Sequence, residues 1–140
     1  MFDVNLLAIL VASVVAFIIG FLFHGPLFGK LWMKLAHITP TGNEKMSDMY
    51  GQMGMNLLMN ILTACVMSVV VNIASSSAFM IDYSAVGIGA FVAFIVWLGF
   101  IFTGSSMDPI WMKTSWKLWA FECVSSLTML LAIGMIVSAW

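Results

Sequence analysis

The sequence predicts an all-α integral membrane protein, a bundle of four transmembrane helices, from three observations. Hydrophobic residues make up 63% of the chain and charged residues 8%, and the mean hydropathy is +1.10, values outside the range of soluble domains. Charges are missing from long stretches of the chain. Each of these stretches holds an apolar run of about 20 residues, enough for a helix to cross a ~30 Å hydrocarbon layer. Helices are expected because lipid offers no partners to open backbone groups.

We expect the four spans at about Val4 to Phe23, Gly54 to Ala74, Ala85 to Phe102 and Leu118 to Ser138. The first span lacks a basic start, follows Asp3 and precedes no small-residue cleavage site. These features distinguish it from a signal peptide, so we expect it to remain in the mature protein.

An interfacial amphipathic helix is predicted after the first span. On a helical wheel the lysines Lys30 and Lys34 lie apart from an apolar side, with Pro26 in the first turn; that side holds Leu27, Phe28, Leu31, Trp32 and Leu35. The two lysines could bind an anionic headgroup. We favour the simpler interpretation, in which their stems lie along the membrane and their ammonium groups reach water.

An internal repeat divides the single membrane domain, residues 1–140, into halves 1–76 and 77–140. Residues 18–34 align without a gap on residues 97–113, and seven of the seventeen positions are identical. The repeat predicts two helical hairpins of the same orientation, related by an axis along the membrane normal. The first cytoplasmic segment, about Gly25 to Met53, is longer than the second, about Gly104 to Lys117.

The lysines predict the orientation of the chain. There is no arginine, the two segments just named hold all five lysines, and the loop from Ser75 to Tyr83 holds none. The positive-inside rule therefore places both termini outside the cytoplasm. We expect lysine and tryptophan side chains to anchor the protein at the interface; they are Lys30, Trp32, Lys34, Trp111, Lys113, Trp116, Lys117 and Trp119.

Three motifs carry a resemblance to a known family. They are residues 23–30 with Trp32 and Met33, residues 96–100, and residues 117–119 at the start of the last helix. With these motifs the chain resembles the small bacterial membrane proteins grouped as domain of unknown function 1761. It departs from the common pattern at His24 and Gly25, where an aromatic residue and serine are frequent. The resemblance implies four helices in a bacterial inner membrane and implies no activity.

Polar residues inside the spans form a candidate seam on the second and fourth helices. Its members are Asn56, Asn60, Asn72, Glu122 and Ser126. Such residues hydrogen-bond between helices or line a path for a polar solute or a proton. We favour the structural role and keep the path as an alternative.

Glu122 is the acidic residue inside a predicted span, and two interpretations stay open. A deep position would favour its neutral form and allow it to carry a proton. A position just below the interface, about 7.5 Å along the axis from Lys117, would pair it with a lysine or an indole N–H. His24 is expected to be a hydrogen-bonded residue at the end of a span.

Small residues predict close helix packing. Ala8, Ala12, Ala16 and Gly20 recur every four residues on the first helix, and Ala85, Gly89 and Ala93 do so on the third. Such ridges bring together either the helices of one chain or two copies of the chain. Because four helices enclose little space, we expect a homo-oligomer or a larger membrane complex.

The sequence predicts no metal, no cofactor and no enzyme activity. Thioethers suit Cu(I), and Met46, Met49 and Met53 have helical spacing, but no histidine or cysteine lies near them in sequence, so we interpret them as packing residues. No hydrolytic motif is present. A net charge of −1 argues against nucleic acid. The lipid bilayer is the expected partner. The predicted function is a non-enzymatic, oligomeric structural or accessory membrane subunit; the alternative is a small-solute or ion channel or transporter.

Overall fold

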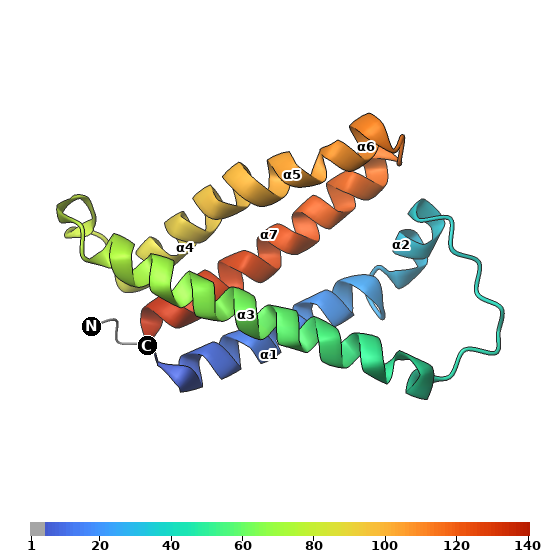
Figure 1. Ribbon diagram of the computed structural model, residues 1–140, viewed down its shortest axis with the longest axis horizontal. Coiled ribbons are helices and arrows are strands. Elements are labelled where there is room, and N and C mark those ends of the chain that lie inside the picture. Colours follow the sequence, from blue (N-terminus) through green and yellow to red (C-terminus); the bar gives the residue numbers. More distant parts are fainter. Residues whose placement is uncertain (1–4) are drawn as a thin grey trace.

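The computed structural model describes residues 5–140 and is all-helical over that range. Its long helices are α1 (Leu6–His24), α3 (Tyr50–Ser75), α4 (Ala85–Val96) and α7 (Trp116–Ala139) (Figure 1). Four segments are long and apolar enough to cross a membrane: Leu6–His24, Met46–Ser75, Ala85–Trp111 and Trp116–Ala139. The predicted all-α class with four helices long and apolar enough to span a membrane is therefore confirmed, while the expected start at Val4 lies outside the described residues.

Helix α7 lies at the centre of the bundle. It packs against α4 and α1 on either side, and α3 packs against α1, α7 and α4. Figure 1 shows α3 crossing over α7 on its way from the α1 side to the α4 side. The start of α1 and the end of α7 lie at one end of the bundle, and α2 and α6 lie at the other.

Small residues permit the closest helix contacts. Ala8, Ala12 and Ala16 of α1 are at most 1% exposed, and Gly20 is half-buried. Helices α4 and α7 meet at Gly89 and Gly134, where a Cβ atom on either glycine would collide with the carbonyl oxygen of the other. The ridge on α1 is thus occupied by contacts within one chain, as is the ridge around Gly89.

The third span is longer than the sequence predicted. After α4 the chain continues through the π-helix η3 (Trp97–Phe102) and the short helices α5 (Thr103–Ser105) and α6 (Met107–Trp111). The expected end at Phe102 is wrong because the helical path continues beyond it. Pro109 lies in the first turn of α6, where a missing N–H costs little.

The segment between the first two spans holds the helix α2 (Gly29–Leu35), which packs against α1 and α7. Its start differs from the expectation, since Pro26 lies in the turn before α2 rather than in its first helical turn. In that turn the N–H of Leu27 donates to Leu22 at 3.0 Å and the N–H of Gly29 to Gly25 at 2.8 Å. The short 3₁₀ helices η1 (Met46–Met49) and η2 (Ala78–Met80) precede and follow α3.

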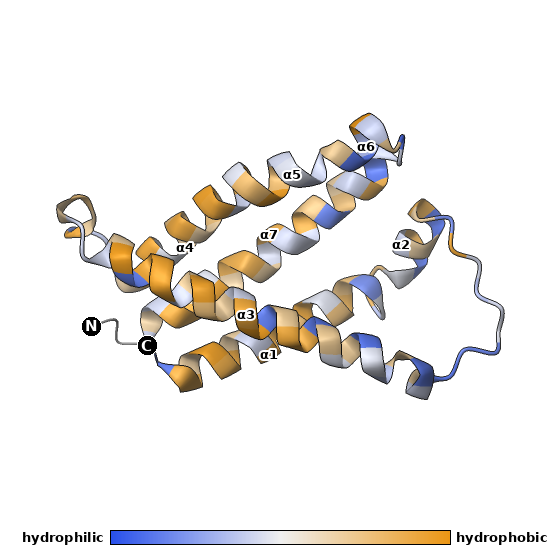
Figure 2. Cartoon of the chain, viewed as in Figure 1, coloured by the Kyte–Doolittle hydropathy of each residue, from blue (hydrophilic) through white to orange (hydrophobic). Residues whose placement is uncertain are grey.

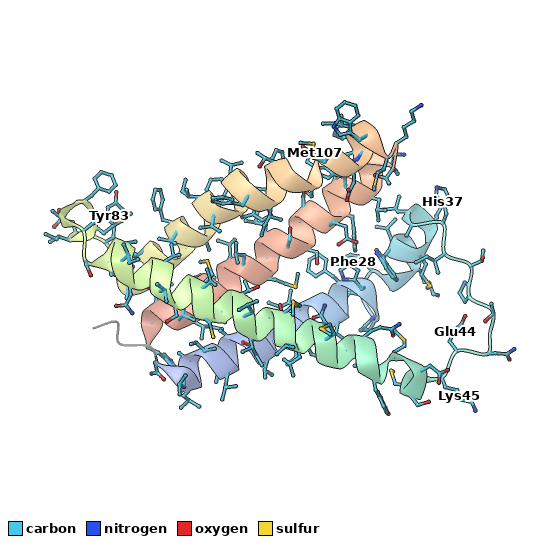
Figure 3. The ribbon with its side chains drawn as sticks, viewed as in Figure 1. Phe28, His37, Glu44, Lys45, Tyr83 and Met107 are labelled. Atoms are coloured by element: carbon cyan, nitrogen blue, oxygen red, sulfur yellow. The ribbon has the colours of Figure 1, made fainter. Side chains whose placement is uncertain are left out.

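Polar residues gather outside the spans. Figure 2 shows hydrophilic positions on the part of the long connection that leads into α3, and Figure 3 places Glu44 and Lys45 there. The Thr41 N–H and hydroxyl donate to the Glu44 carboxylate at 2.7 and 2.9 Å, and the Gly42 N–H donates at 3.2 Å. These bonds, led by the Thr41 N–H, hold the pKa of the Glu44 carboxyl below its usual value.

Candidate functional site

Three side chains from different helices meet where α1 ends. Nε2 of His24 lies 3.1 Å from both carboxylate oxygens of Glu122, and the indole N–H of Trp32 donates to Oε1 of Glu122 at 3.0 Å. The side chains of His24 and Glu122 are 30% and 42% exposed. This cluster of His24, Trp32 and Glu122 joins α1, α2 and α7, and we call it the His–Glu cluster.

Aromatic rings hold the imidazole of His24 in place. The rings of Trp32 and Phe121 stand nearly perpendicular to it, with centroids 5.2 and 5.6 Å away. Its Nδ1 lies 2.9 Å from the carbonyl oxygen of Gly20, one helical turn earlier. Phe121 precedes Glu122 in α7, so the same turn of that helix supplies both the ring that packs against His24 and the carboxylate that pairs with it.

The hydrogen bonds of His24 restrict where protons lie. Gly20 offers only an acceptor to Nδ1, so Nδ1 carries a proton. A hydrogen bond across the remaining contact, between Nε2 and the carboxyl of Glu122, requires one further proton. Either the pair is imidazolium and carboxylate, or the proton lies on Glu122 and the imidazole is neutral. The two forms carry equal numbers of protons, so the cluster can exchange a proton internally without changing its charge.

Part of this cluster is predictable from the sequence. His24 is confirmed as a hydrogen-bonded residue at the end of a span, and the partner of Glu122 is an indole N–H rather than a lysine. The partnership of His24 with Glu122 was missed. The two residues are 98 positions apart, and the available signal was their shared location near the same end of the predicted hairpins.

A pocket of about 230 Å³ lies beside the cluster, between α1, the start of α3 and α7. Its lining combines apolar rings, amides, thioethers and the histidine: Phe17, Gly20, Phe21, His24, Met49, Gln52, Met53, Asn56 and Met129. The predicted seam residue Asn56 therefore shares a pocket with His24. Among residues 5–140, no group of three or more His, Cys, Asp or Glu side chains is placed to hold a metal ion.

The other seam residues form separate hydrogen-bonded groups. Asn60 donates to Asn56 at 2.9 Å along α3. Ser126 accepts from the buried indole N–H of Trp97, in the π-helix, at 3.0 Å. Asn72 has an interaction of its own near the other end of α3. The structure thus joins Asn56 with Asn60 and brings Glu122 to α1 and α2, and it places Ser126 against the third span.

The predicted interfacial residues divide into inward and outward groups. The indole of Trp119 donates to Ser105 at 3.1 Å, as Trp32 donates to Glu122, so both rings face neighbouring helices. Trp111 and Trp116 are 77% and 56% exposed. The lysines of the group are exposed as well; they are Lys30, Lys34, Lys113 and Lys117.

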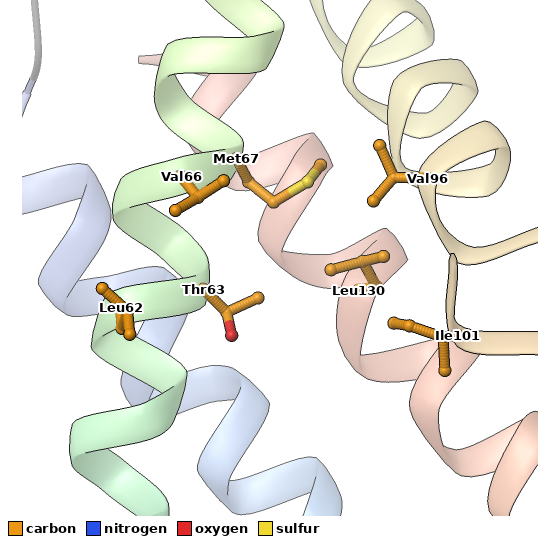
Figure 4. A pocket seen from close by; sticks show the side chains of 7 residues that line it. All are labelled: Leu62, Thr63, Val66, Met67, Val96, Ile101 and Leu130. Atoms are coloured by element: carbon orange, nitrogen blue, oxygen red, sulfur yellow. The ribbon is translucent and has the colours of Figure 1, made fainter. Parts of the chain in front are cut away.

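An apolar groove of about 300 Å³ separates α3 from the third span. Leu62, Val66 and Met67 form one wall, Val96 and Ile101 form the other, and Leu130 of α7 lies between them (Figure 4). Thr63 lines it as well, and its hydroxyl donates to the Met59 carbonyl at 2.9 Å along its own helix. The groove therefore offers an apolar lining with no free hydroxyl donor from Thr63.

Comparison with known families matches residues 7–138 to the protein family of unknown function DUF1761. Comparisons with curated proteins and with solved structures give no match. The family match covers the four spans except Leu6 and Ala139, and it includes all three residues of the His–Glu cluster. The resemblance expected from the sequence motifs is confirmed, and the chain belongs to the DUF1761 family of proteins of unknown function.

Proposed function

We propose that this multi-pass membrane protein is a non-enzymatic structural or accessory subunit of the bacterial inner membrane. One observation carries the proposal: Glu122 and Ser126, two polar side chains inside the spans, hydrogen-bond to side chains of neighbouring helices. Glu122 accepts from Trp32 and pairs with His24, and Ser126 accepts from Trp97. In lipid such bonds fix helix positions, at about 0.6 kcal/mol each on average. The pattern supports a scaffold more strongly than a reaction centre.

The outward face of the bundle supports an assembly. Leu62 and Val66 on one wall of the apolar groove are 58% and 55% exposed, and Ile95 beside the other wall is 49% exposed. The ridges of small residues on α1 and α4 are used inside the chain, so we propose that contacts to another copy or a larger complex use bulky side chains. The lipid bilayer covers the remainder of this surface.

We propose an orientation with both termini outside the cytoplasm and α2 lying at the cytoplasmic interface. Support comes from Lys30 and Lys34 on α2, which are exposed, and from Lys113 and Lys117 at the same end of the bundle. Reporter fusions to each terminus test this topology, and a cytoplasmic signal from the unmodified protein would contradict it. A lysine substitution in the Ser75 to Tyr83 loop, combined with removal of Lys113 and Lys117, should perturb the orientation.

Native mass spectrometry tests the subunit proposal. Protein extracted gently from its own membrane should appear as a homo-oligomer or with stoichiometric partner chains. Glu122→Gln, which removes the charge but keeps the shape, should reduce assembly or stability. A protein that is monomeric in its native lipids and carries solute flux would refute the proposal.

A channel or transporter is the second candidate, favoured by the pocket in which His24 and Asn56 lie together. Under this alternative, Asn60→Leu and Glu122→Gln should abolish flux in proteoliposomes while assembly stays intact. Loss of assembly with unchanged flux would exclude it. The two candidates therefore give opposite results with the same pair of variants.

A further inference from the structure

An open apolar pocket of about 310 Å³ lies between the end of α1, the helix α2 and the first half of α7. It is separate from the pocket that holds His24 and Asn56. Phe28, Leu31 and Val124 are exposed, so the described part of the chain leaves this pocket open. In a bilayer such an opening faces the hydrocarbon chains of lipid. The whole lining is apolar: Phe23, Phe28, Leu31, Ala120, Phe121 and Val124.

Three phenylalanine rings define the shape of this pocket. The ring centroids of Phe23 and Phe28 are 5.4 Å apart, and that of Phe121 lies 6.0 Å from the first and 6.3 Å from the second. These separations are typical of favourable aromatic contacts, and the rings join α1, α2 and α7 at the position of Phe28 in Figure 3. The bond from Trp32 to Glu122 ties α2 to α7 as well. The walls are thus in place before a ligand enters, which lowers the cost of binding.

Two lysines lie one helical turn from the pocket. Lys117 precedes Ala120 by three residues and Phe121 by four, so it lies on the face of α7 that lines the pocket. Lys34 follows Leu31 by three residues on α2. Both lysines are exposed, and among residues 5–140 neither has a carboxylate within ion-pair distance. The pocket therefore has positive charge beside it that the protein leaves unpaired.

The neighbouring acid does not cancel this positive charge. Glu122 follows Phe121 in α7, but its carboxyl group pairs with His24 and accepts from Trp32. The pair is either imidazolium with carboxylate or two neutral groups, and neither form has a net charge. An anion at Lys117 is therefore not repelled by a net negative charge on this pair.

We propose that the pocket binds one anionic phospholipid, with an acyl chain against the three phenylalanine rings and the phosphate paired with the ammonium group of Lys117. Lys34, on the facing helix, adds to the positive potential around the phosphate. The seven residues from Lys117 to Val124 span about 10 Å of helix axis. The headgroup layer on one side of a bilayer is about 5–8 Å thick, so a lysine at headgroup level places Val124 among the acyl chains. Basic pockets between transmembrane helices bind anionic headgroups in this way.

The other lysines at this end of the chain lack such a pocket. A lysine that only extends its ammonium group to water needs no cavity beside it. Lys45 lies on the connection before η1 and Lys113 in the turn before α7, and neither belongs to a helix that lines the pocket. They provide matched controls for the general attraction between lysines and anionic lipids. The proposed site is independent of the proposed subunit function.

The test is native mass spectrometry of the full-length protein in detergent micelles, titrated with phosphatidylglycerol or with phosphatidylcholine of the same chains. Wild type should bind one phosphatidylglycerol in preference to phosphatidylcholine. Lys117→Gln and Lys34→Gln should each weaken phosphatidylglycerol binding about fivefold, the equivalent of about 1 kcal/mol per lysine. Lys45→Gln and Lys113→Gln remove the same charge elsewhere and should leave the affinity unchanged. Equal affinity for the two lipids, or equal losses in the two pairs of variants, would overturn the proposal.

Two further measurements separate the acyl chain from the phosphate. Ala120 is exposed, so Ala120→Leu fills the pocket without entering the core and should weaken phosphatidylglycerol binding. Ala78→Leu makes the same change at an exposed position in η2 and should not. Glycerol phosphate carries the charge without the chains and should not displace the lipid at equal concentration. Displacement by it would assign the site to a soluble phosphate, and unchanged binding in Ala120→Leu would remove the acyl chain from the pocket; either result would overturn the proposal.

Discussion

Gly134→Ala tests the close contact between α4 and α7. The added methyl group would lie 2.8 Å from Cβ of Ala93 and would also collide with the Gly89 carbonyl oxygen. Carbon atoms in ordinary contact are about 3.5–4.0 Å apart, so the helices must separate by about 1 Å. Overpacking of this kind typically costs about 1–3 kcal/mol.

The gain from helix propensity opposes this cost. Alanine is favoured over glycine in a helix interior by roughly 0.5–1 kcal/mol. The net expectation is therefore a loss of about 1–2 kcal/mol in the free energy of unfolding. Unfolding by SDS in mixed micelles, followed by tryptophan fluorescence, measures it, because Trp97 and Trp119 lie on the α4 to α7 side of the bundle.

Gly54→Ala is the matched control. Gly54 lies inside α3, and a Cβ atom there would meet nothing within 4 Å. The same substitution should therefore leave stability unchanged or raise it by about 0.4–1 kcal/mol. If Gly134→Ala unfolds at the same SDS fraction as Gly54→Ala, the close approach of α4 and α7 is not the contact described above.

Three further predictions concern the polar groups. In a double-mutant cycle of His24→Gln and Glu122→Gln, the coupling free energy between the two side chains should be favourable but only about 1 kcal/mol or less, because both are partly exposed. A coupling of zero would show that the His24–Glu122 contact does not stabilise the fold. Trp97→Phe should cost about 0.6 kcal/mol and be non-additive with Ser126→Ala, since both remove one hydrogen bond; additive losses would show that the bond does not form. Thr41→Val should raise the Glu44 pKa toward its usual value in an NMR titration of the carboxyl carbon. Because the folded pKa is depressed, the Glu44 carboxylate stabilises its turn above the usual value, and that contribution is lost as pH falls through the folded pKa; an unshifted titration in Thr41→Val would contradict the assigned hydrogen bond.

The number and kind of helices were predictable because hydrophobicity is a local property of the chain. Runs of apolar residues between charges give the four spans, and Asn5 and Ser115 cap α1 and α7 close to the expected starts. The end of the third span was not predictable in the same way. Trp97 to Phe102 adopt a π-helix, which the hydropathy of these residues does not distinguish from an α-helix. The helical path then continues through α6, with Pro109 in its first turn.

The candidate site depends on contacts that sequence patterns do not encode. Asn56, Asn60, Ala64 and Ser68 follow one periodicity on α3, yet Ala64 and Ser68 are buried while Asn56 lines a pocket. Because α3 crosses its neighbours at an angle, residues of one ridge contact different helices at different points along α3. The crossing of α3, and with it the meeting of Met53, His24 and Met129, follows from packing across the whole bundle.

The central place of α7 has a consequence for biogenesis. Of the four spans it is the last in chain order, and α1, α3 and α4 all pack against it. Until it arrives, Gly20 of α1 and Gly89 of α4 lack the helix that they contact in the finished protein, and the His24 imidazole lacks its acid. The three-helix nascent chain is therefore an unfinished intermediate held in the membrane, and a truncation before Trp116 would leave a substrate for membrane quality control rather than a smaller working protein.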